Sequence, residues 1–197
     1  NYQEATPSFK EGSLDGYYVL GADIDLSSAL KEGGSLYHDG QSFLPIGAYS
    51  DGSYNIPFTG TFDGNGHTIS SFSYVSSNIP VMGFFGNNQG TIKNLTLEGK
   101  IPAKSWSGGL VGNNFGTIEG VICDLELQNG GQSATGVFAS VNHGLISDCF
   151  SVNPNVNGFN EGEKNYQNSG IIVGLNDVEG KLDNVYGISS DPDTKLM

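Results

Sequence analysis

Arginine is absent from this chain, and only eight lysines stand against twenty-one aspartates and glutamates, which gives a formal net charge of −13. A field of that sign repels phosphate backbones and anionic lipid headgroups, and the sequence has no basic cluster to offset it. We therefore expect no nucleic acid partner and no binding to a membrane surface. The acidic surface is compatible with calcium ions or cationic partners, but solubility outside the cell is the simplest explanation.

Long hydrophobic runs are also missing. No stretch of about 18 apolar residues occurs, and no signal peptide opens the chain, which begins with Asn1. We predict no membrane insertion and interpret the chain as a monomeric domain excised from a longer protein. No break in composition divides its 197 residues, so we predict one domain with a cap and insertion (1–57), repeat turns (58–190) and a tail (191–197).

Residues that carry catalytic chemistry are scarce and scattered. The three histidines are isolated, His143 is expected to be a solvated bend residue, and no zinc-peptidase, nucleophile-elbow or phosphate-loop motif occurs. The DGNG run at 63–66 resembles the start of a calcium loop, but no glutamate completes the loop, so an ordinary turn is favoured. Glu119 and Asp148 are expected on neighbouring turns, which is too little for a glycosidase site in a cleft. We expect a non-enzyme without cofactor or metal.

Cysteine is represented only by Cys123 and Cys149. The repeat described below offsets them by one turn of about 4.8 Å and two strand positions of about 3.3 Å each, which places their Cα atoms roughly 8 Å apart. That separation exceeds the usual limit for a disulfide. We predict two buried free thiols, so the cysteines do not decide the compartment.

Glycine, in contrast, is abundant, with thirty residues arranged in a repeated pattern. The segment GFFGNNQGTIKNLTL at Gly83 is followed by GGLVGNNFGTIEGVICDLEL at Gly108, GVFASVNHGLISDCFSV at Gly136 and GIIVGLNDVEGKLDNVYGI at Gly170. A degenerate earlier copy, GHTISSFSY, precedes them. Five units in one chain indicate a repeat protein.

Each unit holds two short apolar runs, rich in β-branched and aromatic residues, which are typical of strands and too short for helices. Because a strand pair of this length cannot bury its apolar side alone, successive units must stack. We predict an all-β fold, a right-handed parallel β-helix of about five turns, each rising about 4.8 Å. Strands at 17–20 and 22–26 and a short helix, capped by Ser27 or Ser28, should close its N-terminal end.

Stacking places equivalent residues in columns along the axis. Two inward apolar columns are predicted, one of Ile92, Ile118, Ile146 and Leu182 and one of Leu95, Val121, Cys149 and Val185. A polar column holds Asn88, Asn114, Asn142 and Asn176, whose amides can pair from turn to turn. The glycine that follows each Asn in the bend is expected to have a positive φ angle.

The repeat units GGLVGNNFGTI and GFFGNNQGTIKNLTL resemble the short glycine-rich repeat known as the GLUG motif. The upstream runs YYVLGADIDLSS and FLPIGAYSDGSYNIPFTGTFDGNGHTI resemble the segment that commonly precedes such repeats in bacterial surface proteins and in streptococcal-type immunoglobulin A1 metallopeptidases. The resemblance covers residues 18–188. It implies an extracellular setting, either secreted or at the bacterial cell surface, and transfers no catalytic residue, because the repeats of the family share none.

Candidate partner contacts lie where side chains leave the repeat. One position past the Val121 column, strand alternation points side chains outward, and three successive turns are apolar there. The residues at this position are Thr96, Ile122, Phe150 and Tyr186. We expect this stripe to be covered, either by the loop at 153–167 through Phe159 and Tyr166 or by a partner. Trp106, in a bend between repeats, is a further candidate contact.

The sequence therefore favours a non-catalytic surface domain that acts as an adhesin-like binding module or as a stalk. Its expected partners are a host protein, a glycan or other domains of the same polypeptide. An accessory domain of an immunoglobulin A1-type metallopeptidase and a carbohydrate-active β-helix enzyme remain as alternatives, since a fold alone does not decide function.

Overall fold

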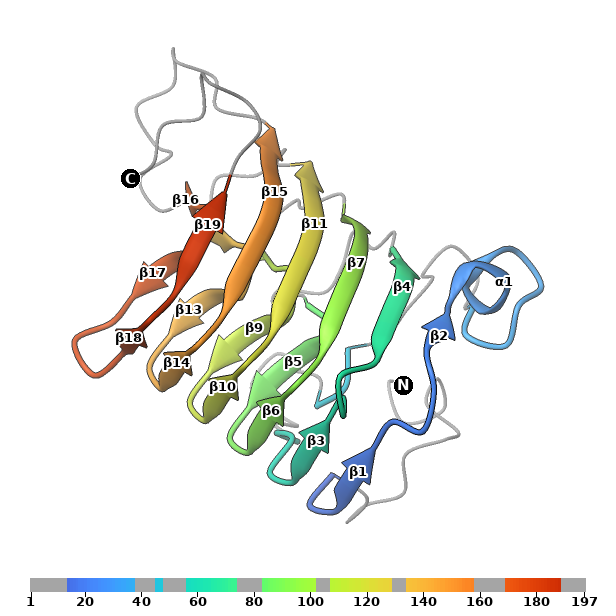
Figure 1. Ribbon diagram of the computed structural model, residues 1–197, viewed down its shortest axis with the longest axis horizontal. Coiled ribbons are helices and arrows are strands. Elements are labelled where there is room, and N and C mark those ends of the chain that lie inside the picture. The colour runs from blue at the N-terminus through green and yellow to red at the C-terminus, as the bar shows by residue number, and fades with distance from the viewer. Residues whose placement is uncertain are drawn as a thin grey trace.

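The protein is a stack of short strands in which one cross-section is repeated along an axis (Figure 1). A computed structural model describes residues 14–37, 45–47, 56–73, 83–101, 107–128, 134–157 and 169–188, without the side chains of 153–157 and 169. This described part contains nineteen strands and one helix, and every pair of named strands is parallel. The predicted all-β class and parallel β-helix are confirmed.

The strands form four sheets that run along the stack. The first sheet consists of β1 (Tyr17–Val19), β3 (Thr61–Asp63), β6 (Thr91–Lys93), β10 (Thr117–Glu119), β14 (Leu145–Ser147) and β18 (Lys181–Asp183). The second consists of β2 (Ile24–Asp25), β4 (Thr68–Phe72), β7 (Thr96–Ile101), β11 (Ile122–Gln128), β15 (Phe150–Asn157) and β19 (Tyr186–Ile188). The third consists of β5 (Phe85–Asn88), β9 (Val111–Asn114), β13 (Ala139–Asn142) and β17 (Val173–Asn176), and the fourth of β8 (Ser107–Gly108), β12 (Thr135–Gly136) and β16 (Ser169–Gly170).

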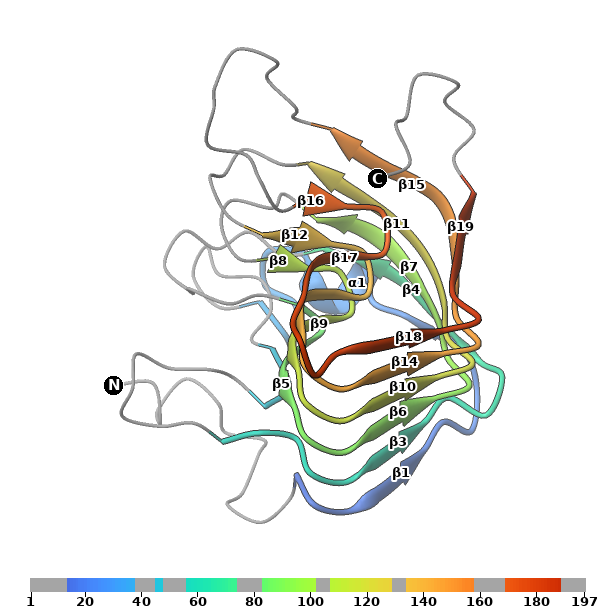
Figure 2. The ribbon, with the colours of Figure 1, turned by 90° about the vertical axis from the view of Figure 1, so that its left-hand side faces the viewer.

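The solenoid is right-handed, as predicted. Figure 2 looks at the stack from its C-terminal end, so the last turn is nearest to the viewer. In that turn the chain runs counter-clockwise from β16 through β17 and β18 to β19, and later turns lie closer to the viewer than earlier ones. A path that turns counter-clockwise as it approaches is a right-handed helix.

The first two sheets each contain six strands, one turn more than the predicted five or so. The extra turn is the segment assigned to the N-terminal cap. Tyr18 in β1 pairs with Phe62 in β3, and Ile24 in β2 pairs with Ile69 in β4, with the same parallel register as the later turns. These strands therefore belong to the solenoid itself.

One turn of helix, α1 (Ser27–Leu30), follows β2 where the sequence predicted it. The predicted capping residue was wrong, because Leu26 occupies the N-cap position without a side-chain cap. Asp25 satisfies the helix start instead, since its carboxylate accepts hydrogen bonds from the Ser27 backbone N and hydroxyl, both at 2.9 Å. Leu26 and Leu30 are buried, so packing against the core fixes where the helix begins.

The inward columns are as predicted, and they show that the core is covered in the middle and open at the ends. Ile92, Ile118 and Ile146 pair with one another in successive turns and are fully buried. The end residues of the same column, Tyr18 and Leu182, are 39% and 43% exposed. In this column, a residue of the first or the last turn has a neighbouring turn on one side only, which accounts for the exposure of Tyr18 and Leu182.

The predicted asparagine column is a continuous ladder of hydrogen bonds along the bend between the third and first sheets. The side-chain Nδ2 of Asn88 donates to Oδ1 of Asn114, Asn114 donates to Asn142, and Asn142 donates to Asn176, each at 2.8 Å. The first three side chains are fully buried, whereas Asn176 is exposed. Each inner amide is thus satisfied by its neighbours in the stack.

The glycines that follow this ladder do not have the positive φ angles that we expected. The left-handed glycines of the described residues are Gly33, Gly47, Gly66 and Gly120. Gly116 and Gly144 are needed for another reason, because a Cβ on Gly116 would clash with the carbonyl oxygen of Gly90, and one on Gly144 with that of Gly116. The same carbonyls accept hydrogen bonds from the next turn, so the glycines allow the turns to approach closely.

The left-handed conformation instead occurs at the corner between the first and second sheets. Asn94, Gly120, Asp148 and Asn184 occupy equivalent positions there, with φ angles of 52°, 62°, 52° and 56°. Asn, Asp and Gly are the residues that adopt this conformation most readily. A single column of such residues therefore turns the chain by a similar amount in each of these turns.

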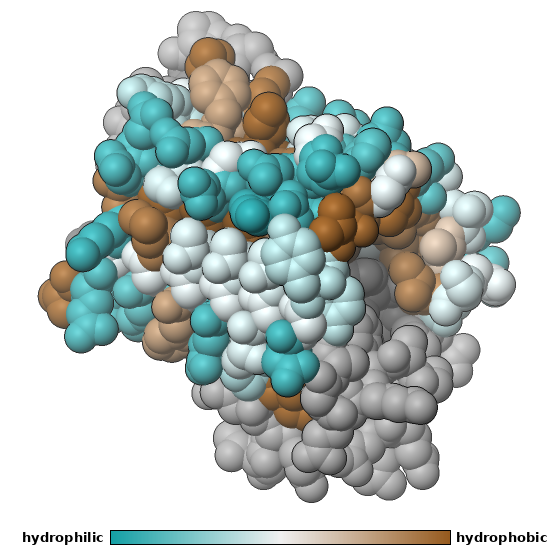
Figure 3. Space-filling view, turned by 60° about the horizontal axis from the view of Figure 1, so that its bottom comes forward, coloured by the Kyte–Doolittle hydropathy of each residue, from teal (hydrophilic) through white to brown (hydrophobic). Residues whose placement is uncertain are grey.

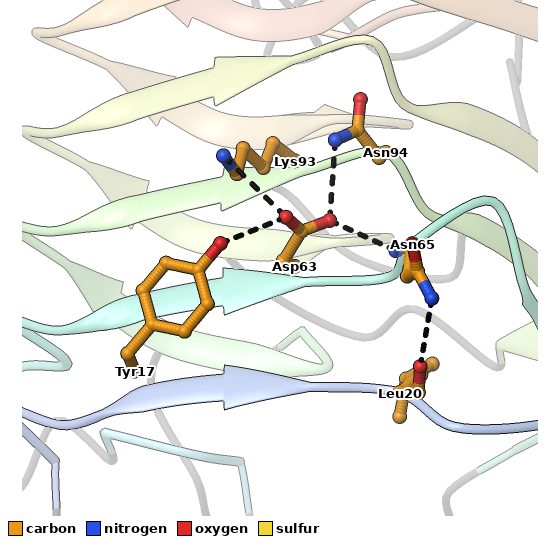
Figure 4. Close-up of polar contacts among 6 residues, drawn as sticks. All are labelled: Tyr17, Leu20, Asp63, Asn65, Lys93 and Asn94. Carbon is orange, nitrogen blue, oxygen red and sulfur yellow. Dashed lines mark hydrogen bonds and ion pairs between the residues drawn. The ribbon is translucent and has the colours of Figure 1, made fainter.

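Polar contacts around Asp63 tie the first three turns together (Figure 4). Its carboxylate accepts hydrogen bonds from the Tyr17 hydroxyl at 3.0 Å, from the backbone N of Asn65 at 2.9 Å and from the side chain of Asn94 at 3.1 Å, and Lys93 lies at 3.4 Å. Hydrogen bonding, above all from Asn65, holds the pKa of Asp63 below its usual value. The DGNG segment leads into a tight turn from Gly64 to His67, in which the His67 backbone N donates to the Gly64 carbonyl oxygen at 2.8 Å. The central residues of this turn, Asn65 and Gly66, both have positive φ angles.

Cys123 and Cys149 are free and buried, which confirms the prediction made from their columns. Burial raises the pKa of the Cys149 thiol to about 11 and that of Cys123 well above its usual value. The Cys149 sulfur also lies 3.1 Å from the carbonyl oxygen of Ser147. Both thiols are held protonated in the core and behave as small apolar groups.

Candidate partner-binding site

The outward stripe predicted from the repeat is present on the second sheet. Ile122 in β11 pairs with Thr96 in β7 and with Phe150 in β15, and Phe150 pairs with Tyr186 in β19. Ile122 is 41% exposed and Tyr186 is 58% exposed, while Phe150 is partly buried. Cys123, next to Ile122, is fully buried, so the assigned strand alternation is correct.

The apolar surface extends further than the sequence analysis recognised. Val152 and Ile188 pair with each other two positions beyond Phe150 and Tyr186, and Ile188 is 58% exposed. Alternation places both on the outer face next to the stripe. We call the five residues Ile122, Phe150, Val152, Tyr186 and Ile188 the C-terminal apolar patch. Applying the same strand alternation two positions further along the sequence would have predicted Val152 and Ile188 as part of this outward surface.

Carboxylates flank this patch on two sides. On one side the outward column of Val152 continues into Asp124 and Glu98 of the preceding turns, both exposed. On the other side the exposed Asp148 and Asp183 stand at the corner that leads into β15 and β19. Figure 3 shows hydrophobic side chains gathered at the upper left, bordered below by a band of hydrophilic residues.

The carboxylates that flank the patch form no ion pair with a lysine of the described residues. Lys100 lies 3.0 Å from Glu126, further along β7 and β11, and forms an ion pair there. Among the described residues, none of the four flanking acids takes part in an ion pair. The patch therefore combines an apolar centre with a negative border.

The patch also adjoins the open end of the solenoid. Within the described ranges, β18 pairs only with β14, and β19 pairs only with β15. The outer edge of β19, which carries Tyr186 and Ile188, thus presents backbone N–H and C=O groups without a strand partner in that part of the chain.

A second cluster of side chains was missed at the sequence level. His143, expected to be a solvated bend residue, lies with its ring stacked on Phe115, with centroids 4.4 Å apart and planes within 3°. Its Nδ1 lies 2.8 Å from Asp177 Oδ2. These residues follow the asparagine ladder in successive turns, and flat side chains in one column at this spacing stack naturally. Phe115 remains 49% exposed.

The other candidate contacts, Trp106, Phe159 and Tyr166, lie outside the described residues. The two acids considered for glycosidase chemistry lie on neighbouring turns, as predicted, where Glu119 stands opposite Ser147 and Asp148 accepts a hydrogen bond from the side chain of Asn184. No group of three or more His, Cys, Asp or Glu side chains within the described part of the chain is placed to hold a metal ion. In the same part of the chain, no helix has the length and apolar character needed to span a membrane.

No family model and no solved structure matches this chain. Among curated proteins it is similar to halomucin from Haloquadratum walsbyi, with 32% identity over an alignment of 129 residues that covers 63% of this chain. The chain spans about 1% of the length of halomucin. The similarity concerns one short segment of a far longer protein, and the resemblance to the GLUG motif stays a prediction.

Proposed function

We propose that this β-helix is a non-catalytic binding module of a cell-surface or secreted protein, adhesin-like in its action. The observation that carries the proposal is the C-terminal apolar patch. Ile122, Tyr186 and Ile188 are each more than two-fifths exposed on one face of one sheet. Scattered apolar residues are normal on a protein surface, but a contiguous group on paired strands is typical of an interaction site.

The scaffold beneath the patch supports a binding role. The inward neighbours on these strands, Cys123, Leu125 and Ser151, are fully buried, and the strands are paired in register through several turns. Side chains on such a sheet are held in a fixed arrangement before a partner arrives. Binding then costs little ordering of the protein itself.

The comparison with halomucin supports the proposed location at a coarse level. A protein named as a mucin is consistent with a cell-surface or secreted setting, and the similar segment is a very small part of it. A rigid solenoid within such a long chain is suited to presenting a side surface to partners at a fixed distance from its attachment.

The proposal is tested by probing arrays of extracellular proteins and glycans with the purified chain. A double variant, Ile122→Thr with Tyr186→Thr, keeps residues with high strand propensity at both positions while it removes two exposed apolar side chains. Phe115→Thr removes a comparably exposed aromatic group from another face and serves as the control. We expect protein ligands whose signal is lost with the double variant and kept with the control. The absence of any array ligand, or ligands indifferent to the double variant, would contradict the proposal.

A further inference from the structure

We infer that the partner of the C-terminal apolar patch is an extended segment of another protein that presents apolar residues together with lysine or arginine on the same face. This inference rests on the proposed binding function and specifies the chemistry of the partner. Two features of the described surface carry it: the shape of the apolar patch and the charge that borders it.

The shape of the patch favours an extended segment. Ile122, Phe150 and Tyr186 form one row across three adjacent strands, and Val152 and Ile188 form a second row beside it. Adjacent strands lie about 4.8 Å apart, so the three-residue row spans about 10 Å. An extended chain repeats its same-face side chains every 6–7 Å or so. Two or three apolar side chains of such a segment would therefore cover the row.

The charges favour a cationic segment. Glu98 and Asp124 border one side of the patch and Asp148 and Asp183 the other, and the whole chain carries a formal charge of −13. A neutral partner would bury or crowd these carboxylates without compensating them, whereas lysine or arginine on both sides of an apolar row meets them. An acidic partner or a nucleic acid would be repelled.

The same two features favour a polypeptide over a glycan. A protein segment can supply apolar side chains for the row of Ile122, Phe150 and Tyr186 together with lysine or arginine for the bordering carboxylates. A sugar has no regular row of apolar side chains for the patch.

Short acetylated and amidated peptides that carry valine, tyrosine and lysine at every second position, and hence on one face of an extended chain, test the inference. Matched peptides carry glutamate or glutamine in place of lysine. Binding to the full chain is measured by calorimetry at low and high salt. We expect the lysine peptide to bind at least about tenfold more tightly than the glutamine peptide, which is about 1.4 kcal/mol. Its affinity should fall as salt rises, because the bordering carboxylates are exposed. The glutamate peptide should show no binding.

Two sets of variants locate the site. Ile122→Thr with Tyr186→Thr should weaken the lysine peptide about tenfold, and Asp124→Asn with Asp183→Asn should remove most of the salt dependence. Asp15→Asn with Glu32→Gln makes the same change in net charge at exposed positions in the N-terminal part and should leave the affinity unchanged. Equal binding of all three peptides, or equal effects of both charge variants, would overturn the inference. The array experiment tests the binding function separately. Array ligands that need the patch but lack cationic segments would support the binding function and contradict only the chemistry inferred for the partner.

Discussion

The asparagine ladder makes a sharp prediction about position in the stack. Asn114→Leu keeps the size of the side chain but removes both amide contacts, leaving Nδ2 of Asn88 and Oδ1 of Asn142 without their ladder partners. All three positions are fully buried, so water does not replace the lost partners. Each orphaned buried group costs about 1–3 kcal/mol, which gives a loss of about 2–6 kcal/mol in unfolding free energy.

Asn176→Leu provides a matched control for the same substitution at the end of the ladder. Only the donor of Asn142 loses a ladder partner there, and Asn176 itself is exposed, so solvent can take over much of the lost bonding. We expect a loss below about 1 kcal/mol. Equilibrium urea unfolding of both variants, with the slope and the midpoint fitted separately, measures the difference. Equal losses for the two variants would refute the buried ladder as the source of stability.

Three further predictions concern a glycine between stacked turns, the two buried thiols and the stability of the fold at low pH. Gly116→Ala should cost about 1–3 kcal/mol through overpacking between turns, whereas Gly21→Ala, where a Cβ meets nothing within 4 Å, should change the unfolding free energy little. Thiol titration of denatured, unreduced protein should count both cysteines, and the native protein should react far more slowly, because burial raises the pKa of Cys149 to about 11. The pKa of Asp63 is lowered, first by the hydrogen bond from Asn65, so its carboxylate stabilises the fold above pH 3.8 and this contribution is lost as the pH falls through the lower folded pKa. Below pH 3.8, the melting temperature of the Asp63→Asn variant should therefore fall less steeply with falling pH than that of the unchanged protein. The same pH dependence for both proteins would contradict this role of Asp63.

The repeat could be read from the sequence because each turn places the same residue types in the same environment. The pairing of Ile92 with Ile118 and Ile146 followed from alignment alone, as did the ladder through Asn114. Asn176 also belongs to the ladder, as the alignment predicted in spite of the longer bend that follows it, because its side-chain oxygen accepts a hydrogen bond from Asn142. In a solenoid the long-range contacts are fixed by the period, which is a local property of the sequence.

The first turn escaped this reading because it lacks the asparagine bend by which the other units were aligned. What it retains is a glycine followed two residues later by an inward apolar residue, Gly16 and Tyr18, as in Gly116 and Ile118. That weaker signal marks the strand of the first sheet in every turn. The bend glycines were misread because a sequence shows that glycine is needed but not whether the reason is a φ angle or a close approach.

The two ends of the stack differ in a way that bears on function. The N-terminal end carries α1, whose Leu30 packs into the core, whereas in the described part of the chain the last turn has no such cover. Leu182 and Asn176, whose counterparts in the preceding turn are buried, are both exposed in that turn. A turn with a neighbour on one side only is the least stable of a solenoid. Tyr186 and Ile188 lie on this turn, so a partner that binds the patch also covers the weakest part of the fold, and binding energy adds directly to its stability.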